Sequence, residues 1–384
     1  MNNLTYYFGA GASAGTKKKP AIPILFGFNE KLTGFFNELL LKELNAKDPQ
    51  HTYTELSDEA FLDNVVKHIP KLKQLIYTDG NPIFDRNFLY FIKNGSDILN
   101  ELNEHTTVDT LARKYFLLGE EGEFKLVALK ALLSIYFLHL QHNDDRFDMR
   151  YDSFVSTILD RGQRGGLELP NNVKIVSWNY DLQFEMALKK YQKSSLREIQ
   201  EQFGIHPSME YYGKSRTMST FGMAKLNGTA GLFFDLKNKS VRDIDEIAPE
   251  QIEREELFNL FFGICRGGEY SISPFYRYSW EDDNERYDAI PNMKAFLTIY
   301  AKEIMSHTNH LVVIGYSFPP FNRRVDIELF NCLPTNTVVY IQDKNPVRKQ
   351  NVLDIFRNFE EKNITVEFIE DVSQFYIPPI YFEE

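Results

Sequence analysis

Short runs of apolar residues recur along this chain, and each ends in turn-forming or polar residues. They are rich in β-branched and aromatic side chains, and most are apolar on both faces, which is typical of strands in a parallel sheet covered by helices. The alternation of these runs with helical patterns predicts an α/β protein with a Rossmann-like parallel sheet of about six strands. The predicted strands are Leu4–Phe8, Val173–Ser177, Met223–Leu226, Leu311–Gly315, Val338–Gln342 and Ile364–Ile369, and the helices that follow some of them are Leu182–Tyr191, Arg324–Cys332 and Val347–Phe359.

A long stretch with helical periodicity separates the first predicted strand from the second. Apolar residues recur three and four positions apart in Phe35–Leu44, Phe61–Ile76 and Phe124–His142. Pro70 lies inside the second of these runs and is expected to kink or divide it. We therefore predict one domain, residues 1–384, with a Rossmann core at about 1–29 and 166–384 and a helical insertion at about 30–165. A second, more polar insertion is predicted at about 237–306, ending in a helix over Met293–Ser306.

The composition narrows the class of protein. The 384 residues are 43% hydrophobic and 25% charged, which is typical of folded proteins. The net charge of −11 is opposite to that of most proteins that bind nucleic acid phosphates, so nucleic acid is not expected as a direct partner. The two cysteines, Cys265 and Cys332, cannot form a four-cysteine zinc site or a disulfide framework. Neither a signal peptide nor an apolar stretch of about 18 residues is visible, which predicts a cytoplasmic protein without a membrane partner.

A glycine-rich segment, Gly9-Ala10-Gly11-Ala12-Ser13, directly follows the first predicted strand. Small residues let backbone N–H groups approach a pyrophosphate, and a following helix directs the positive end of its dipole at the same charge. A tight strand-to-helix turn without a ligand explains the pattern equally well. A dehydrogenase would need a second strand ending in an acidic residue about 20 positions on. The chain instead continues through Lys17-Lys18-Lys19-Pro20 into the helical stretch, which argues against a hydride-transfer enzyme.

An amide and a carboxylate follow the second buried strand, in the segment Ser177-Trp178-Asn179-Tyr180-Asp181. In an open parallel sheet, ligands lie beyond the carboxyl ends of the strands. Asn179 and Asp181 could there orient a substrate hydroxyl, a water or a carboxamide. Both residue types also cap helices, and a helix is predicted to begin near Leu182. The sequence leaves these two interpretations open.

Three further strand ends carry glycine or polar residues. Lys225-Leu226-Asn227-Gly228-Thr229 runs from a strand into a glycine turn. Gly315 and Ser317 follow the next strand, where the hydroxyl could meet a ribose or a phosphate, and Asp343 follows the strand after that. Each segment on its own fits a plain strand-to-helix connection. The four segments with Gly9, Ser177, Lys225 and Gly315, at strand ends and in this order, indicate a nucleotide site.

Taken in order, Gly-Ala-Gly-Ala-Ser from Gly9, Asn-Tyr-Asp from Asn179, Lys-Leu-Asn-Gly from Lys225 and Ile-Gly-Tyr-Ser-Phe-Pro from Ile314 resemble the sirtuin-like NADase domains of bacterial antiphage defence proteins. The segment Thr107-Val108-Asp109-Thr110 is similar to one that such domains carry in their helical region. The resemblance covers nearly the whole chain and implies a single sirtuin-like domain. It also implies an NAD(+) glycohydrolase that cleaves NAD to nicotinamide and ADP-ribose and depletes the NAD of an infected cell. Stand-alone members work with a HerA-type hexameric ATPase and assemble into rings, which implies a homo-oligomer with such a partner.

The resemblance assigns a role to each matched segment, with NAD as the substrate and no metal. Asn179 would lie beside the nicotinamide ribose and orient it or a water, and Asp181 would bind the carboxamide. The remaining contacts to NAD would come from Gly9, Ala10, Gly11, Ala12 and Ser13 at the pyrophosphate, from Gly315, Ser317 and Asp343 at the adenosine half, and from Gly228.

One position departs from the family pattern. The resembled motif is Lys-Leu-His-Gly, in which the histidine acts as a base toward a ribose hydroxyl or a water, but this chain has Asn227 there. An amide cannot take up a proton near neutral pH, so general-base catalysis worth about 10²–10⁴-fold would be missing. Either the protein has lost or reassigned the base, or Asn227 is an introduced, inactivating substitution. The intact flanking motif favours the second explanation.

Two other functions compete with NAD cleavage. A sirtuin deacylase resembles this chain in its cofactor motifs, but it carries a zinc ribbon with paired Cys-X-X-Cys, which the sequence lacks. The main alternative is a non-catalytic module that senses NAD or ADP-ribose, and Asn227 favours it. Activity of the Asn227→His variant would separate an enzyme from a sensor.

Overall fold

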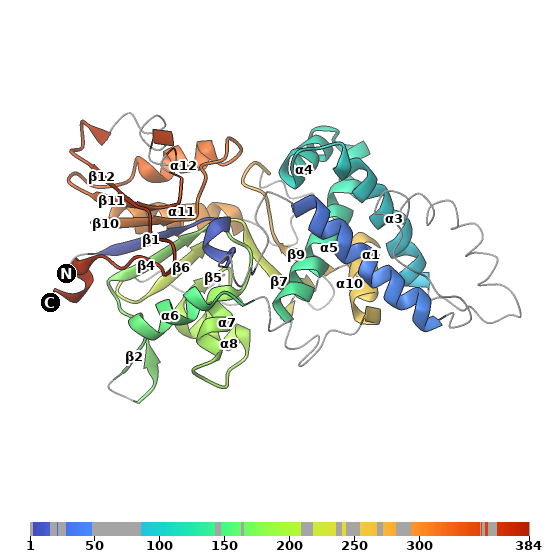
Figure 1. The fold of residues 1–384 in the computed structure, drawn as a ribbon, viewed down its shortest axis with the longest axis horizontal. Coiled ribbons are helices and arrows are strands. Elements are labelled where there is room, and N and C mark those ends of the chain that lie inside the picture. The colour runs from blue at the N-terminus through green and yellow to red at the C-terminus, as the bar shows by residue number, and fades with distance from the viewer. Residues whose placement is uncertain are drawn as a thin grey trace, which may run out of the picture. The chain divides into compact units, whose positions relative to one another are not determined.

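A seven-stranded parallel sheet dominates the fold in the computed structural model (Figure 1). The predicted α/β class with a Rossmann-like sheet is therefore confirmed. The strands, in their order across the sheet, are β12 (Thr365–Ile369), β11 (Val338–Gln342), β10 (His310–Ile314), β1 (Leu4–Phe8), β4 (Val173–Ser177), β6 (Gly222–Lys225) and β5 (Ile205–His206). The structure describes residues 3–15, 21, 28–47, 86–142, 147–162, 165–208, 218–235, 240–242, 254–266, 272–281, 293–345, 347, 350–351 and 359–383.

Strand β1 lies where the winding of the sheet reverses. The strands β4 and β6 extend the sheet on one side of β1, whereas the later strands β10, β11 and β12 extend it on the other. Phe8 is paired with Ser177 of β4 and with Ile314 of β10, so the three strands end at the same level. Open α/β sheets bind their ligands beyond the carboxyl ends of the strands at such a reversal. The topology therefore directs attention to the loops that follow Phe8, Ser177 and Ile314.

Helices cover both faces of this sheet, and each face has its own apolar core. Tyr6 and Phe8 of β1 contribute to one core, while Tyr7 contributes to the other. Because successive residues of a strand point to opposite faces, a strand covered on both sides is apolar throughout. The helices of the first face are α6 (Met149–Ile158), α7 (Gln183–Lys189) and α8 (Leu196–Phe203), and those of the second are α11 (Met293–Ser306) and α12 (Arg323–Phe330).

Local signals fix the ends of α8 and the start of β5. The Ser195 side chain accepts the N–H of Glu198, and the Glu198 carboxylate accepts the N–H of Ser195, which is a complete capping box. Gly204 ends the helix in the left-handed conformation, at φ 61°. The two residues of β5 follow directly. A strand of two residues leaves no periodic pattern, and this explains why the sequence predicts about six strands and the sheet has seven.

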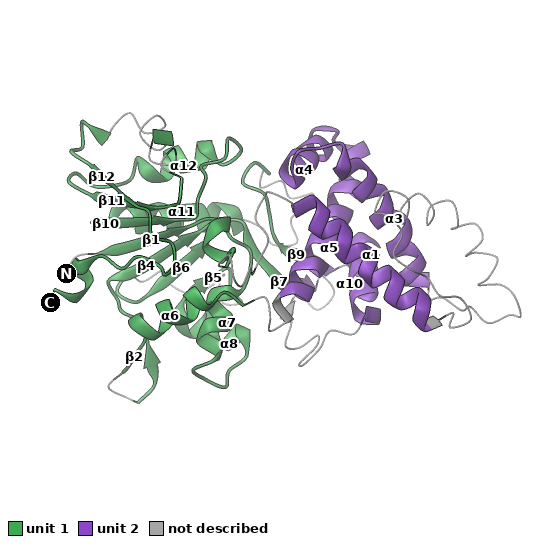
Figure 2. Cartoon of the chain, in the orientation of Figure 1, with its two compact units in different colours: residues 1–22, 143–232, 275–384 green, residues 23–142, 233–274 purple. Residues whose placement is uncertain are grey.

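The chain forms two compact units, shown in Figure 2: residues 1–22, 143–232 and 275–384 make unit 1, which holds the parallel sheet, and residues 23–142 and 233–274 make unit 2. Unit 2 has an aromatic core in which Phe91 packs at ring-centroid distances of 4.8 Å from Phe36 and 5.1 Å from Phe258. Its described helices are α1 (Phe28–Lys47), α3 (Arg86–Asn103), α4 (Val108–Leu117), α5 (Glu120–His142) and α10 (Arg254–Arg266).

The division into units differs from the boundaries that the sequence predicts. The helical insertion was expected to extend to about residue 165, but α6 belongs to unit 1, because Phe154 and Ile158 are buried in the core beneath the sheet. The second insertion, expected at about 237–306, is divided: residues 233–274 contribute α10 to unit 2, and residues 275–306 belong to unit 1. Helical periodicity identifies an amphipathic helix but not the surface that it covers, and for this reason α6 could not be assigned from the sequence.

Most other predicted elements are present: the ends of the strands and of α7 and α12 shift by one or two residues, while α1 and α5 begin several residues before the predicted runs. The helix predicted over Met293–Ser306 has those bounds, and Thr107 is the N-cap of α4, where its side chain accepts the N–H of Thr110. The helix predicted at Phe61–Ile76, including Pro70, lies outside the described residues, as does most of the one at Val347–Phe359. The remaining strands are β2 (Asp160–Arg161) and β3 (Leu167–Glu168), which form an antiparallel pair, and β7 (Gly228–Asp235), β8 (Ser240–Arg242) and β9 (Ile272–Tyr276), in the order β8-β7-β9.

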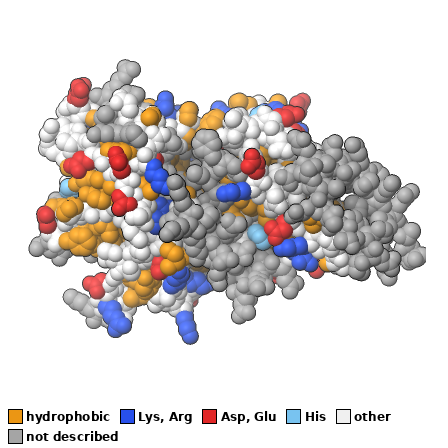
Figure 3. Space-filling view, viewed as in Figure 1, with side chains coloured by type: hydrophobic (Ala, Val, Ile, Leu, Met, Phe, Trp, Pro, Cys, Tyr) orange, Lys and Arg blue, Asp and Glu red, His pale blue; other side chains and the backbone are white. Residues whose placement is uncertain are grey.

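Two properties of the described residues bear on partners. None of the described helices is long and apolar enough to cross a membrane. On the face shown in Figure 3, the basic side chains of the described residues are interspersed with acidic and hydrophobic ones.

Candidate functional site

The glycine-rich loop after β1 packs directly against the loop after β10. Gly9 N–H donates to the carbonyl of Ile314 at 3.0 Å, and Gly11 N–H donates to that of Gly315 at 2.9 Å. A Cβ on Gly9 would lie 2.6 Å from Tyr316 Cα, and one on Gly11 would lie 2.8 Å from Gly315 Cα. The small residues of this loop therefore allow two backbone segments to touch.

These contacts qualify the role predicted for the loop. The N–H groups of Gly9, Gly11 and Ala12 all donate to carbonyl groups of the protein. Ala10, the first residue of a short 3-10 turn, is the exposed residue of the loop. Of the five backbone N–H groups from Gly9 to Ser13, three therefore donate to the protein itself in this arrangement. Binding of a pyrophosphate by this loop stays a prediction.

Replacement of Gly315 by alanine is expected to lower the free energy of unfolding of unit 1 by about 2–4 kcal/mol. The residue has φ +60°, and a Cβ would lie 2.3 Å from the carbonyl carbon of Gly11. Both tryptophans, Trp178 and Trp280, lie in unit 1, so denaturation followed by tryptophan fluorescence measures this unit. The control is Gly166→Ala, where a Cβ would meet nothing within 4 Å. Equal midpoints for the two variants would contradict the predicted clash.

Arg150 of α6 holds the other side of the glycine-rich loop. Its guanidinium Nη2 donates to the carbonyls of Gly11 and Ala12, each at 3.1 Å, and pairs with the Asp148 carboxylate at 2.7 Å. Asp148 in turn accepts the N–H of Gly15 at 2.8 Å. Both charged side chains are buried. The pair fixes the direction of the loop carbonyls, and the charge of Arg150 is neutralised by Asp148.

Ser13 joins the glycine-rich loop to the segment after β4. The amide Nδ2 of Asn179 donates to Ser13 Oγ at 3.0 Å, and Tyr151 Oη lies 3.0 Å from the same oxygen. Ser13 also shares a hydrogen bond with the Asp181 carboxylate. A serine hydroxyl has one donor and two acceptor positions. Ser13 therefore has its hydrogen-bonding capacity filled by the protein and serves to hold Asn179 and Asp181 in place.

The surroundings of Asp181 affect its charge. Burial raises the pKa of this carboxyl, while the ammonium of Lys225 and the hydrogen bond from Ser13 lower it. Burial and the charge of Asp181 raise the pKa of Tyr151 well above its ordinary value, so Tyr151 remains a neutral phenol. The N–H of Gln183 donates to Asp181 Oδ1 at 3.1 Å. Asp181 thus bonds the first N–H of α7 (Gln183–Lys189), whose N-cap residue is Leu182 and has no side-chain cap.

The Asn179 side-chain oxygen can accept a hydrogen bond from a ligand. Only 7% of the Asn179 surface is exposed. Its Nδ2 donates to Ser13 Oγ, and its backbone N–H donates to Ser177 Oγ. Among the described residues, no group donates to its Oδ1. An amide oxygen in this position can accept a hydrogen bond from a hydroxyl, a carboxamide or a water.

Asn227, in the turn between β6 and β7, presents a second amide oxygen. Its Nδ2 donates to the carbonyl of Trp178 at 3.0 Å, and its own carbonyl accepts the N–H of Arg277 at 2.8 Å. The Oδ1 is buried and has no hydrogen-bond partner in the described part of the chain. Asn179 follows β4 and Asn227 follows β6, and these strands are neighbours in the sheet. The bond from Asn227 to the carbonyl of Trp178, the residue before Asn179, links the two strand ends. The turn itself needs Gly228, which has φ +77° and whose Cβ would lie 2.2 Å from the carbonyl oxygen of Phe275.

A buried lysine, Lys225, is hydrogen-bonded to the segment that follows β4. Lys225 Nζ donates to the backbone carbonyl of Asp181 at 2.5 Å and to Glu185 Oε1 at 2.9 Å, and Gln200 donates to the same carboxylate oxygen at 3.1 Å. Lys225 and Glu185 are fully buried. A buried charge needs such a partner. The network fixes the segment that carries Asn179 and Asp181.

Ser317 and Asp343 lie further along the same edge of the sheet, after β10 and β11. Ser317 is half-buried, and its hydroxyl has no partner among the described residues. Asp343 Oδ1 accepts the N–H of Asn345 at 2.8 Å, which is a local turn contact. The structure brings Ser13, Asn179, Asp181 and Asn227 together by direct or shared contacts, whereas Ser317 and Asp343 follow two other strands of the sheet.

The sequence did not single out Asp148, Arg150, Tyr151 or Glu185. Each of them acts through a contact with a distant segment, and nothing local distinguishes it from a surface residue of an amphipathic helix. Lys225 did leave a signal, since a lysine inside an apolar strand has to be neutralised or paired.

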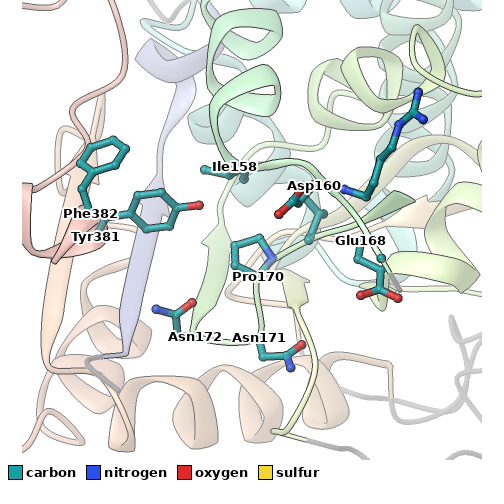
Figure 4. Close-up of a pocket in the computed structure, with 11 residues that line it drawn as sticks. Ile158, Asp160, Glu168, Pro170, Asn171, Asn172, Tyr381 and Phe382 are labelled. Atoms are coloured by element: carbon teal, nitrogen blue, oxygen red, sulfur yellow. Dashed lines mark hydrogen bonds between the residues drawn. The ribbon is translucent and has the colours of Figure 1, made fainter. Parts of the chain in front are cut away.

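A pocket of about 440 Å³ lies at the opposite end of β4 (Figure 4). Asn171 and Asn172, which precede β4, line it together with Asp160, Glu168 and Tyr381. This location is the amino end of the strand, where open α/β sheets do not carry their ligands. The pocket is therefore separate from the candidate site.

The sequence matches no protein-family model and no curated protein. In the part of the chain that the structure describes, no three His, Cys, Asp or Glu side chains are grouped so that they could hold a metal ion. The function must therefore be argued from the geometry of the site.

Proposed function

We propose that this protein binds NAD at the carboxyl ends of β1, β4 and β10 and that its site is built for cleavage of NAD to nicotinamide and ADP-ribose. The observation that carries the proposal is a pair of amide oxygens at the carboxyl ends of the neighbouring strands β4 and β6. Asn227 Oδ1 is buried without a partner, and none of the described residues donates to Asn179 Oδ1. The ribose hydroxyls and carboxamide of NAD are donors that such oxygens accept. The resemblance of four loop segments to sirtuin-like NADases supports the same conclusion.

Cleavage of the nicotinamide–ribose bond needs no strong nucleophile, because the ribose carbon passes through an oxocarbenium-like state. The protein has to hold the ribose and position a water. In the proposal, Asn179 orients the ribose or the water and Asp181 binds the carboxamide. The contacts of Ser13 and Lys225 keep these two residues in place.

The second candidate function is a module that senses NAD or ADP-ribose without turnover. Asn227 favours it, since its amide is fixed by the Trp178 carbonyl and cannot act as a base. We also propose, from the resemblance, a cytoplasmic homo-oligomer that works with a HerA-type ATPase in antiphage defence. Both candidate functions require the same binding site.

Titration calorimetry with NAD and with ADP-ribose tests the site. We expect saturable binding of both, and a loss of affinity of about tenfold or more in Ser317→Trp, since a large side chain there would obstruct the ligand. The matched control is Asn171→Trp in the pocket at the amino end of β4, which should leave both affinities within about twofold. Absence of binding would contradict the proposal. Loss of binding only in the Asn171 variant would move the ligand to the other end of the sheet.

A further inference from the structure

A fully buried carboxylate on α12 accepts hydrogen bonds from three aromatic side chains. Asp326 Oδ1 lies 2.6 Å from Tyr7 Oη and 3.2 Å from Trp178 Nε1, and Tyr316 Oη lies 2.9 Å from Oδ2. Trp178 Nε1 also donates to Tyr7 Oη at 2.7 Å. The rings of Trp178 and Tyr316 are stacked, with an interplanar angle of 8°. These four residues form one cluster, which we call the Asp326 cluster.

The three donors lie in or directly after β1, β4 and β10, three of the strands that end at the candidate site. Tyr7 lies in β1, two residues before Gly9, and Trp178 directly precedes Asn179. Tyr316 follows Gly315 and is the residue whose backbone contacts Gly9. Asp326 therefore connects the ends of β1, β4 and β10 through a single side chain.

We propose that Asp326 is a positioning residue, which in its ionised form holds these three strand ends in the arrangement that the site requires. The inference about ligand binding rests on the proposed function, whereas the coupling of the strand ends does not.

The chemistry of the cluster requires an acceptor. An ionised carboxylate is acceptor-only and can satisfy all three donors, whereas a protonated one has to direct its own O–H at an acceptor. Among the described residues, the side chains that are hydrogen-bonded to it, two phenols and one indole, are donors to it. Protonation therefore either removes one of the three hydrogen bonds or reverses it, because only a phenol oxygen could accept the carboxyl O–H.

The titration of Asp326 falls near neutral pH. Burial raises the pKa of Asp326 to about 7. The hydrogen bonds from Tyr7, Tyr316 and Trp178 and the positive charge of Arg323 act in the opposite direction and lower this pKa. Among described residues these are the titratable or charged groups that face it. On the neighbouring helix α11, Lys302 is paired with Glu328 instead. Burial and Asp326 raise the pKa of both phenols well above their ordinary value, so they remain donors.

The raised pKa of Asp326 makes stability depend on pH. Because the folded state binds the proton of the Asp326 carboxyl more tightly than the unfolded chain does, the contribution of Asp326 to stability falls as the pH rises from about 4 to about 7.

The test uses Trp178 as its own reporter. In a Trp280→Phe background, Trp178 is the single tryptophan, and its indole N–H contacts Asp326. We expect its emission to change with a midpoint between about pH 6 and pH 8, and the change to vanish in Asp326→Asn. Glu328→Gln, which removes another carboxylate of α12, should keep it. Tyr316→Phe should move the midpoint to higher pH, because the hydrogen bond from Tyr316 lowers the pKa of Asp326.

The affinity for NAD gives the second readout. It should fall about tenfold between pH 8 and pH 6 in the parent, and at pH 8 Asp326→Asn should already have the lower value. A parent without an emission change near neutral pH, or an Asp326→Asn variant that retains it, would overturn the inference. Should Asp326→Asn fail to fold, the Tyr316→Phe midpoint decides, and an unmoved midpoint would overturn it. A parent that shows the emission change but binds neither NAD nor ADP-ribose supports the coupling and contradicts the proposed function.

Discussion

Replacement of Asn227 by histidine is expected to raise the rate of nicotinamide release by about 10²–10⁴-fold. The side chain at position 227 lies at the end of β6, beside the carbonyl of Trp178 and one strand from Asn179. An imidazole there has a nitrogen that can take up a proton near neutral pH, which the amide cannot do. Chromatography of NAD incubated with each protein measures nicotinamide and ADP-ribose directly.

Two further variants make this result specific. Asn227→Gln retains an amide and should remain at the background rate. Addition of Asn179→Ala to the histidine variant should abolish turnover while NAD still binds, because Asn179 orients the ribose or the water. Turnover that survives without Asn179 would contradict its assignment. A histidine variant that binds NAD but releases no nicotinamide would favour the sensor function, and the assay would then be repeated with a HerA-type ATPase present.

Replacement of Arg150 by methionine is expected to lower the free energy of unfolding of unit 1 by about 3–5 kcal/mol and to abolish NAD binding. The change leaves the buried Asp148 carboxylate without its cation, and it removes the donors to the carbonyls of Gly11 and Ala12. The loop would lose the contact that fixes its direction. Denaturation followed by tryptophan fluorescence measures the first effect, and calorimetry measures the second.

A surface arginine provides the comparison. Arg197 pairs with Glu201 one turn along α8 and keeps 39% of its side-chain surface exposed, so Arg197→Met should cost less than about 1 kcal/mol. The double variant Asp148→Asn with Arg150→Met should recover part of the stability, because no unpaired buried charge remains. If Arg150→Met is as stable as Arg197→Met, the buried pair does not support the loop.

The sequence predicted the sheet well for a physical reason. Strands such as β1 and β4 are covered on both faces, so they leave continuous apolar runs that end at turn residues. The loops that follow them were visible for the same reason, and four of the predicted site residues, Ser13, Asn179, Asp181 and Asn227, lie together.

The supports of the site could not be predicted in this way. Arg150 lies 139 positions from Gly11, and Asp326 lies 319 positions from Tyr7. Their roles arise only when α6 and α12 pack on opposite faces of the sheet. A helix pattern shows Asp326 as one polar residue among several, and it does not show the three aromatic donors that meet it.

The contact between the loops after β1 and β10 has a thermodynamic consequence. Because Gly9 and Gly11 are bonded to Ile314 and Gly315 in the free protein, the backbone of both loops is ordered before any ligand arrives. A site that closes around its ligand loses conformational entropy on binding, and this loss offsets part of the favourable contacts. A preorganised loop avoids most of that entropic loss. The free energy of even a few hydrogen bonds to a small ligand then contributes almost fully to its affinity.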